Sequence, residues 1–318
     1  MVTVFNYDLD QSPGSIPPPL SPQLVTCRGG IIPLTTPDFC KSVQGSVFQQ
    51  KRKSRPFVSI VSALVCKNAI IVASDSRMTD TPSYRDDAKK IFRIELKEGT
   101  ALVAHSGHID SSSAVLDFLF ESVRGQALQD HRMIAEAASS AILRFKQNLA
   151  KQNGCTPKTV KAIIARDDLN CSLMVCHFFD GKPFIFAGNL NGLGGGLSRI
   201  RGFSHWSIGI GKELAQYFLS QFNIAEMDRL LAVSTAVSVI HEVKSCVTGC
   251  GGDIQVSAIN SLNRSVELSA GGIRKIEARM ADEIKDYKRQ WLIKMERILT
   301  RGAQEYPSEN ITGLESYR

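Results

Sequence analysis

Residues 58–77 read VSIVSALVCKNAIIVASDSR, and this stretch decides the fold. β-Branched and other apolar residues fill both of its halves, and the polar pair Lys67-Asn68 lies between them. Apolar runs of this kind favour strands, and a short polar pair between two of them is typical of the turn of a β-hairpin. The stretch therefore predicts a hairpin with strands over residues 58–65 and 69–74.

The remainder of the chain twice follows strands with two helices. The apolar period changes from that of a strand to that of a helix in each half of the chain. The expected strands are 90–94, 101–104, 172–179, 183–188, 203–208, 254–260 and 265–268, and the expected helices are 115–123, 133–152, 212–222 and about 223–244. Asn223, with Glu226 three residues later, has the pattern of a capping box for the last of these helices. This order predicts an α+β fold in which two sheets pack face to face with helices outside, a four-layer αββα sandwich.

Both ends of the chain differ from this middle part. Eight of the twelve prolines lie in residues 1–56 without any sustained periodicity, so we expect a disordered extension or pro-segment there. The folded domain is then expected over residues 57–272. Residues 273–318 begin with apolar residues at steps of three and four, which predicts a long amphipathic helix that packs on the domain or on a neighbouring subunit.

Composition excludes several classes of function. The 318 residues carry a net charge of +7, but no aromatic residues accompany the basic runs, so nucleic-acid binding is not expected. The start of the chain has no secretory signal, and no stretch has the length and apolarity of a membrane span. We therefore expect a cytoplasmic protein.

The eight cysteines do not have the pattern of a disulfide scaffold or a metal site. Cys171 and Cys176 lie close together in the sequence, as do Cys246 and Cys250, but His177 is the nearest further metal-ligand type. We expect buried structural thiols, and neither a metal nor another cofactor.

Charged residues cluster at the predicted strand ends. Asp75 and Arg77 follow the second strand, and the pair Lys89-Lys90 precedes the third. A lysine that shares a buried pocket with another cation loses its proton more easily and can act as an acid or a base. The same pattern also fits an ordinary salt-bridge network at the end of a sheet.

The hairpin with Asp75-Ser76-Arg77, followed by Asp87-Ala88-Lys89-Lys90-Ile91-Phe92, resembles the opening of a proteasome β-type subunit, a member of the N-terminal nucleophile (Ntn) hydrolase superfamily. The resemblance continues more weakly through 104–110, 208–211 and 251–256. In that family a threonine is freed at the N-terminus by self-cleavage and uses its own α-amine as the base. An α-amine has a pKa near 8, which suits proton exchange near neutrality.

The resemblance assigns a role to each residue of the cluster. Counting sixteen positions back from Asp75 gives Ser59 as the nucleophile. Asp75 and Arg77 would order the site, and Lys90 would lower the pKa of the nucleophile and stabilise its alkoxide. The backbone N–H of His105 would be an oxyanion donor.

The sequence departs from the family pattern at several positions, which leaves three functions open. Ser59 replaces the threonine, Val58 replaces the glycine before the cleavage point, Ile210 replaces a serine, and no supporting aspartate lies shortly before Gly251. The first interpretation is a threonine-type or serine-type peptidase or amidase that acts after the pro-segment is removed. The second is a catalytically inactive proteasome-like structural subunit. The third is a non-hydrolytic binding module, with the basic linker 51–55 as the contact for an acidic partner.

The resemblance also implies partners. Subunits of this family assemble with their own kind, so self-association into a ring or another homo-oligomer is expected. A peptide or protein substrate and an ATP-dependent unfoldase are compatible with the first interpretation.

Overall fold

The computed structural model describes residues 25–27, 30–32, 59–80, 83–97, 99–127, 129–156, 159–160, 163–164, 169–191 and 196–282. Contacts divide the chain into two units, residues 1–273 and 274–318. The sandwich lies in the first unit. Residues 270–282 are helical, whereas the C-terminal helix was predicted from residue 273, and the rest of that prediction falls outside the described residues.

The predicted hairpin forms the centre of the first sheet. Strands β3 (Ile60–Cys66) and β4 (Ala69–Asp75) pair antiparallel around Lys67 and Asn68. The order of the sheet is β12-β3-β4-β13-β14, with β12 at His205–Gly209, β13 at Ile254–Asn260 and β14 at Ser265–Glu267. All neighbouring strands are antiparallel, so the start of β3 and the end of β4 lie side by side at the same end of the sheet.

The second sheet has the order β11-β10-β9-β8-β7 and is also antiparallel. Its strands are β7 (Ile91–Leu96), β8 (Gly99–Gly107), β9 (Cys171–Phe179), β10 (Lys182–Asn189) and β11 (Ser198–Arg199). A small hairpin of β5 (Met78–Asp80) and β6 (Ser83–Arg85) lies between β4 and β7 in the chain.

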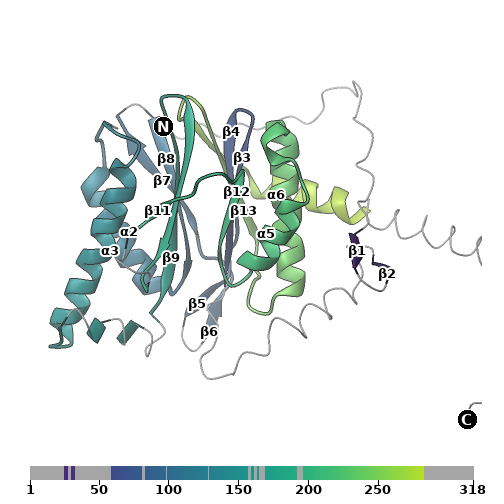
Figure 1. Ribbon diagram of the computed structural model, residues 1–318. Helices are drawn as coiled ribbons and strands as arrows, with labels where there is room; N and C mark the ends of the chain where they lie inside the picture. Colours follow the sequence, from purple (N-terminus) through teal and green to yellow (C-terminus); the bar gives the residue numbers. More distant parts are fainter. Residues whose placement is uncertain are drawn as a thin grey trace, which may run out of the picture. The chain divides into compact units, whose positions relative to one another are not determined.

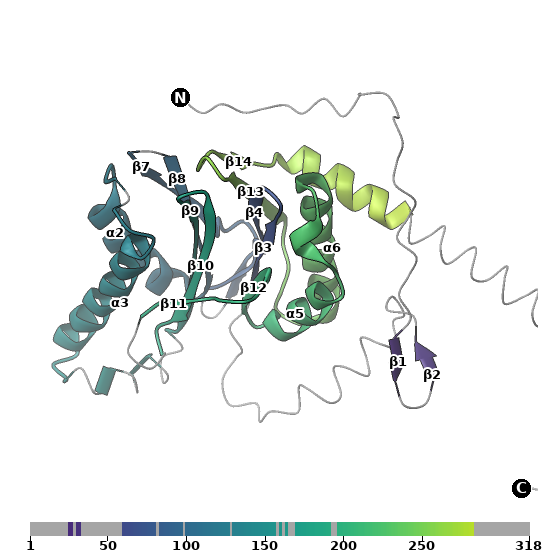
Figure 2. The ribbon, with the colours of Figure 1, turned by 45° about the horizontal axis from the view of Figure 1, so that its top comes forward.

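Helices cover the outer face of each sheet, which confirms the predicted four-layer sandwich (Figures 1 and 2). Helices α2 (Ile109–Val123) and α3 (Met133–Gln152) pack on the second sheet, while α5 (Lys212–Ser220) and α6 (Arg229–Cys246) pack on the first. One apolar cluster, which includes Val61, Val72, Leu102 and Met174, fills the space between the sheets. A second fills the space between the second sheet and α2 and α3.

The start of α6 differs from the capping-box prediction. Asn223 precedes only a short 3-10 turn (η2, Ile224–Glu226), and its side chain makes no capping bond. The cap of α6 is Asp228, whose Oδ1 accepts the N–H of Leu231 at 2.9 Å. Asn and Asp side chains can both cap a helix. The 3-10 turn lies between Asn223 and Asp228, so the long helix begins after Asp228.

Part of the N-terminal segment that was expected to lack regular structure forms a hairpin. Strand β1 (Val25–Cys27) pairs with β2 (Gly30–Ile32). The β-branched residues of this hairpin favour strands. The high proline content of residues 1–56 as a whole had led to the prediction of disorder. The remaining residues of the predicted extension lie outside the described part of the chain.

Asn263, in the turn between β13 and β14, fastens the two sheets together at one end. Its side chain accepts the N–H of Phe178 and donates to the carbonyl of Phe178, both at 2.9 Å. Its own carbonyl accepts the N–H of Thr100 at 2.8 Å. Asn263 has φ of 54°, a left-handed conformation that asparagine tolerates better than most residues. We call this contact the Asn263 clasp.

Candidate active site

Ser59, Asp75 and Lys90 meet at one end of the two sheets, and the Asn263 clasp lies at the other end. Ser59 directly precedes β3 and Asp75 ends β4, so the antiparallel register brings them together. Lys90 precedes β7 and reaches across from the second sheet. Its Nζ lies 2.5 Å from Ser59 Oγ and 2.5 Å from Asp75 Oδ1, and Ser59 Oγ lies 3.5 Å from Asp75 Oδ1. The structure therefore joins a hydroxyl, an ammonium and a carboxylate from two sheets.

All three side chains are fully buried. Burial lowers the pKa of Lys90, and the neighbouring Asp75 carboxylate opposes that change. The carboxylate itself is held on both oxygens: Oδ1 accepts the N–H of Ile60 at 3.0 Å and Oδ2 accepts that of Gly251 at 2.9 Å. An ammonium between a hydroxyl and a fixed carboxylate can stabilise a negative charge on the hydroxyl oxygen.

The backbone of Lys90 is fixed by a side chain from β13. Its N–H donates to Gln255 Oε1 at 3.0 Å, and Gln255 Nε2 donates to the carbonyl of Ala88 at 2.6 Å. Its neighbour Lys89 is exposed and pairs with Glu267 at 3.5 Å. The structure thus places Lys90, and not Lys89, beside Ser59, as the sequence pattern proposed. Gln255 belongs to β13, far away in the sequence, and nothing in its local sequence indicates that it binds Lys90.

Arg77 contacts the loop that holds Asp75. Its guanidinium makes two bonds to Asp86, Nε–Oδ1 at 2.6 Å and Nη2–Oδ2 at 2.9 Å, and lowers the pKa of that carboxyl. Nη1 lies 3.5 Å from the carbonyl of Cys250. A Cβ on Gly251 would lie only 2.4 Å from the guanidinium carbon, so a side chain at this position would push the guanidinium away. Arg77 therefore orders the segment that supplies the Gly251 N–H.

Ser76 closes the same end of the domain. Its hydroxyl donates to the carbonyl of Asp86 and accepts the N–H of Asp253 at 2.7 Å.

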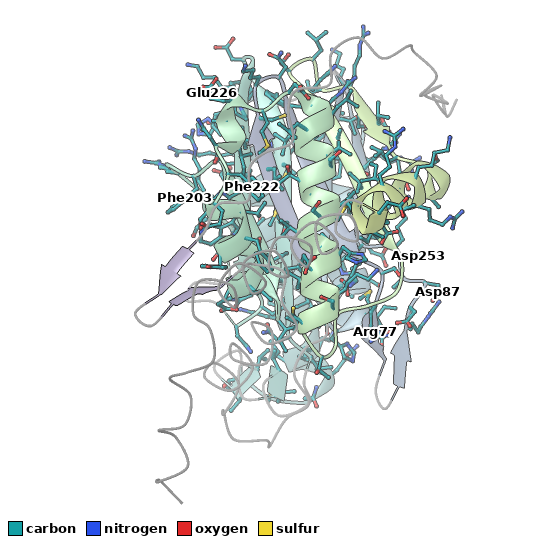
Figure 3. The ribbon with its side chains drawn as sticks, turned by 90° about the vertical axis from the view of Figure 1, so that its right-hand side faces the viewer. Arg77, Asp87, Phe203, Phe222, Glu226 and Asp253 are labelled. Atoms are coloured by element: carbon teal, nitrogen blue, oxygen red, sulfur yellow. The ribbon has the colours of Figure 1, made fainter. Side chains whose placement is uncertain are left out.

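Figure 3 shows Arg77, Asp87 and Asp253 on one side of the molecule and Phe203 and Glu226 on the other.

The backbone N–H of His105, the expected oxyanion donor, takes part in the second sheet. Its backbone N–H donates to the carbonyl of Lys90 at 3.1 Å and so continues the ladder between β7 and β8 by one pair. The imidazole is buried against Phe92, with ring centroids 5.6 Å apart. The N–H that was expected to bind an oxyanion is therefore already used within the sheet.

Two buried histidines make the stability of the domain depend on pH. Burial is the main cause that lowers the pKa of His105 and His177 from 6.5 to about 4. The unfolded chain therefore takes up more protons between these values, so the free energy of unfolding should fall as the pH drops from 6.5 towards 4, by at most roughly 3 kcal/mol per histidine. Urea unfolding at pH 7.5, 6 and 5 measures the slope. His177→Phe, which keeps a ring between Phe184 and Phe186, should reduce it; an unchanged slope in the variant contradicts the assignment.

Two surface cavities formed by described residues lie away from Ser59. One, of about 400 Å³, is lined by Val65, Ile200 and Phe203 among others, and the other, of about 230 Å³, by Leu96, Phe178 and Leu262 among others. The strand register places both towards the end with the Asn263 clasp. Ser59 itself is fully buried.

Other sequence-based expectations concern metals, thiols and membranes. Among the described residues, no three histidine, cysteine, aspartate or glutamate side chains gather as a metal site. Cys171, Cys176 and Cys250 are buried free thiols. None of the described helices is long and apolar enough to cross a membrane.

Comparison with known proteins gives three findings. The family model for the proteasome subunit matches residues 59–259, a match that begins at Ser59. No curated protein matches the sequence. Among solved structures, the chain is similar to Anbu (ancestral beta-subunit) from Yersinia bercovieri, with a TM-score of 0.57 and 13% identity over 73% of this chain and 97% of that one.

Two further solved structures show the same fold. Anbu from Hyphomicrobium sp. strain MC1 has a TM-score of 0.55 and 13% identity, covering 72% of this chain and 97% of that one. The helical assembly of the Anbu complex from Pseudomonas aeruginosa has a TM-score of 0.53 and 18% identity, covering 76% and 96%. The family model spans more than half of the chain, and the fold agrees with it, so this chain belongs to the proteasome subunit family.

Proposed function

We propose that this protein is a proteasome-like Ntn hydrolase that cleaves peptide or amide bonds with Ser59 as its N-terminal nucleophile, after removal of the residues up to Val58. The contact of Lys90 Nζ with both Ser59 Oγ and Asp75 Oδ1, at 2.5 Å each, carries this proposal. The start of the family match at residue 59 supports it.

The reaction uses the α-amine that cleavage frees, together with Lys90 and Asp75. The free α-amine of Ser59 takes the hydroxyl proton while Oγ forms a bond to the substrate carbonyl carbon. Lys90 stabilises the negative charge on Oγ, and Asp75 holds Lys90 in place. The amine of the substrate leaves with the proton from the α-ammonium, which gives an ester on Ser59. Water then loses a proton to the α-amine and attacks the ester, which releases the acid and restores the hydroxyl.

The expected setting follows from the family. The protein is cytoplasmic and associates with copies of itself in a ring or another homo-oligomer. The Anbu complex from Pseudomonas aeruginosa forms a helical assembly. A peptide or protein is the substrate class, and an ATP-dependent unfoldase is a compatible partner. Gel filtration with light scattering tests the self-association directly.

The second candidate is a catalytically inactive structural subunit. The observation in its favour is Ile210, whose N–H binds the carbonyl of Ser59 at 2.9 Å while its side chain offers no hydroxyl to the site. A non-hydrolytic binding module is the third candidate, and the basic linker 51–55 on which it rests lies outside the described residues.

Intact mass and N-terminal sequencing of the purified protein separate these candidates. The wild type is expected to begin at Ser59, and Ser59→Ala is expected to remain full length, because the attacking oxygen is gone. Ser62→Ala is the matched control: this hydroxyl is also buried in β3, binds Ser207 at 2.8 Å, and should leave cleavage intact. A wild type that keeps Val58 bonded to Ser59 would reject the hydrolase proposal and favour the structural subunit.

A further inference from the structure

The larger of the two surface cavities lies at the end of the sandwich that carries the Asn263 clasp. Its volume of about 400 Å³ is within the range of sites that bind small ligands. Val65 from β3, Ile185 from β10 and the segment 199–203 between β11 and β12 form it. Val65 and Ile200 pack against the apolar cluster between the sheets, and Ile185 belongs to that cluster. The apolar part of the cavity is therefore continuous with the core.

Phe203 adds an aromatic surface to this cavity. Its side chain is 61% exposed, and Figure 3 shows it on the side of the molecule away from Arg77. The ring lies 5.9 Å from that of Trp206, between centroids, and Trp206 packs against the cluster between the sheets. Phe203 is thus supported from one side, and its exposed part can contact the apolar body of a ligand.

Two arginines give the cavity a positive charge. Arg199 and Arg201 both line it and are exposed, and none of the described residues that line it is acidic. The guanidinium of Arg199 lies over the Phe184 ring, 4.2 Å from its centroid. Within the part of the chain that the structure describes, Arg201 has no ion-pair partner. Because a guanidinium can bind a carboxylate through two parallel hydrogen bonds, the charge favours a carboxylate ligand.

We propose that this cavity binds a small carboxylate with an aromatic body, in which Arg201 contacts the carboxylate and Phe203 contacts the ring. The smaller cavity, of about 230 Å³, is lined by Asp180 in place of the arginines, so its charge has the opposite sign. The proposed site is independent of the hydrolase function, because Val65 and Ser59 stand at opposite ends of β3.

Two probes with the same ring test the site on the full chain: 4-phenylbutanoate, an anion, and 4-phenylbutan-1-ol, which is uncharged. The chain has two tryptophans, so Trp291→Phe labelled with 5-fluorotryptophan has a single fluorine NMR signal, that of Trp206 beside Phe203. We expect the acid to shift this signal with a dissociation constant on the order of 1 mM, which is usual for a ligand of about a dozen heavy atoms. The alcohol should bind about tenfold more weakly, because it gives Arg201 no charge to pair with.

Matched variants in the same background separate the two contacts. Arg201→Met should bring the two probes to within about twofold of each other, whereas Arg264→Met, at the exposed arginine after Asn263, should keep the preference for the acid. Phe203→Ala should weaken both probes by roughly fivefold, the contribution of one aromatic contact. Leu262→Ala, at a side chain that is 66% exposed beside the smaller cavity, should weaken neither.

Three results would overturn the proposed site. The first is equal binding of the acid and the alcohol before Arg201 is changed, and the second is an equal loss of preference in Arg201→Met and Arg264→Met. The third is a signal that neither probe shifts, the result expected if a second copy of this chain fills the cavity; dilution of the protein would then shift the Trp206 signal. Cleavage before Ser59 does not enter these measurements, so their failure leaves the proposed function untouched.

Discussion

Lys90→Met is expected to slow cleavage before Ser59, and any later hydrolysis, by a factor of roughly 10³, the loss typical of removing one preorganised charge-stabilising group. Lys90 Nζ lies 2.5 Å from Ser59 Oγ, so the variant removes the cation that stabilises the attacking oxygen. Methionine keeps a similar apolar length in the buried space. A time course of intact mass after synthesis measures the rate.

Lys89→Met is the matched control for this experiment. Lys89 is adjacent in the sequence but exposed, and its partner is Glu267 at the surface. We expect its cleavage rate to stay within about twofold of the wild type, since surface ion pairs contribute little. Equal rates for both variants would show that the buried ammonium has no part in the reaction, provided that circular dichroism shows Lys90→Met to be folded.

Asp75→Asn is expected to lower the free energy of unfolding by about 3–5 kcal/mol, the usual cost of removing one partner from a buried ion pair. Asp75 is fully buried and accepts from Lys90, the Ile60 N–H and the Gly251 N–H. The amide leaves the buried ammonium without its counter-charge and turns an NH₂ group towards one set of donors. Urea unfolding in a Ser59→Ala background, which keeps all chains the same length, measures the change.

The double variant Asp75→Asn with Lys90→Met gives the sharper test. Because it removes both charges together, it should be destabilised by less than the sum of the single variants. Asp87→Asn, at an exposed aspartate, should change the free energy of unfolding by less than about 0.5 kcal/mol. Additive single effects would mean that Asp75 and Lys90 do not act as a pair.

The hairpin and the layers could be predicted because their signals are local. β3 and β4 are buried on almost every residue, so their apolar runs and the turn at Lys67 are legible without the rest of the fold. Asp75 and Lys90 could be placed near each other because both stand at strand ends. The cap of α6 could not be predicted, because Asn223 and Asp228 are both residues that favour the start of a helix. Only the 3-10 turn between them shows that Asp228 is the cap.

The residues that support the site could not be predicted from the sequence for a different reason. Gln255 and Gly251 come from the last third of the domain and act on Lys90 and Asp75 through tertiary contacts. Nothing in their local sequence indicates those partners. The use of the His105 N–H by Lys90 depends on one extra pair in the ladder, a register detail that a composition pattern does not contain.

The Asn263 clasp and the site stand at opposite ends of the same interface between sheets. Ser59 and Asp75 belong to one sheet and Lys90 to the other, so the serine meets the ammonium only after the sheets have docked in register. A chain that is still half folded has the hydroxyl without its cation. Under the proposed function, cleavage before Ser59 would therefore occur only in chains whose two sheets have already packed together correctly.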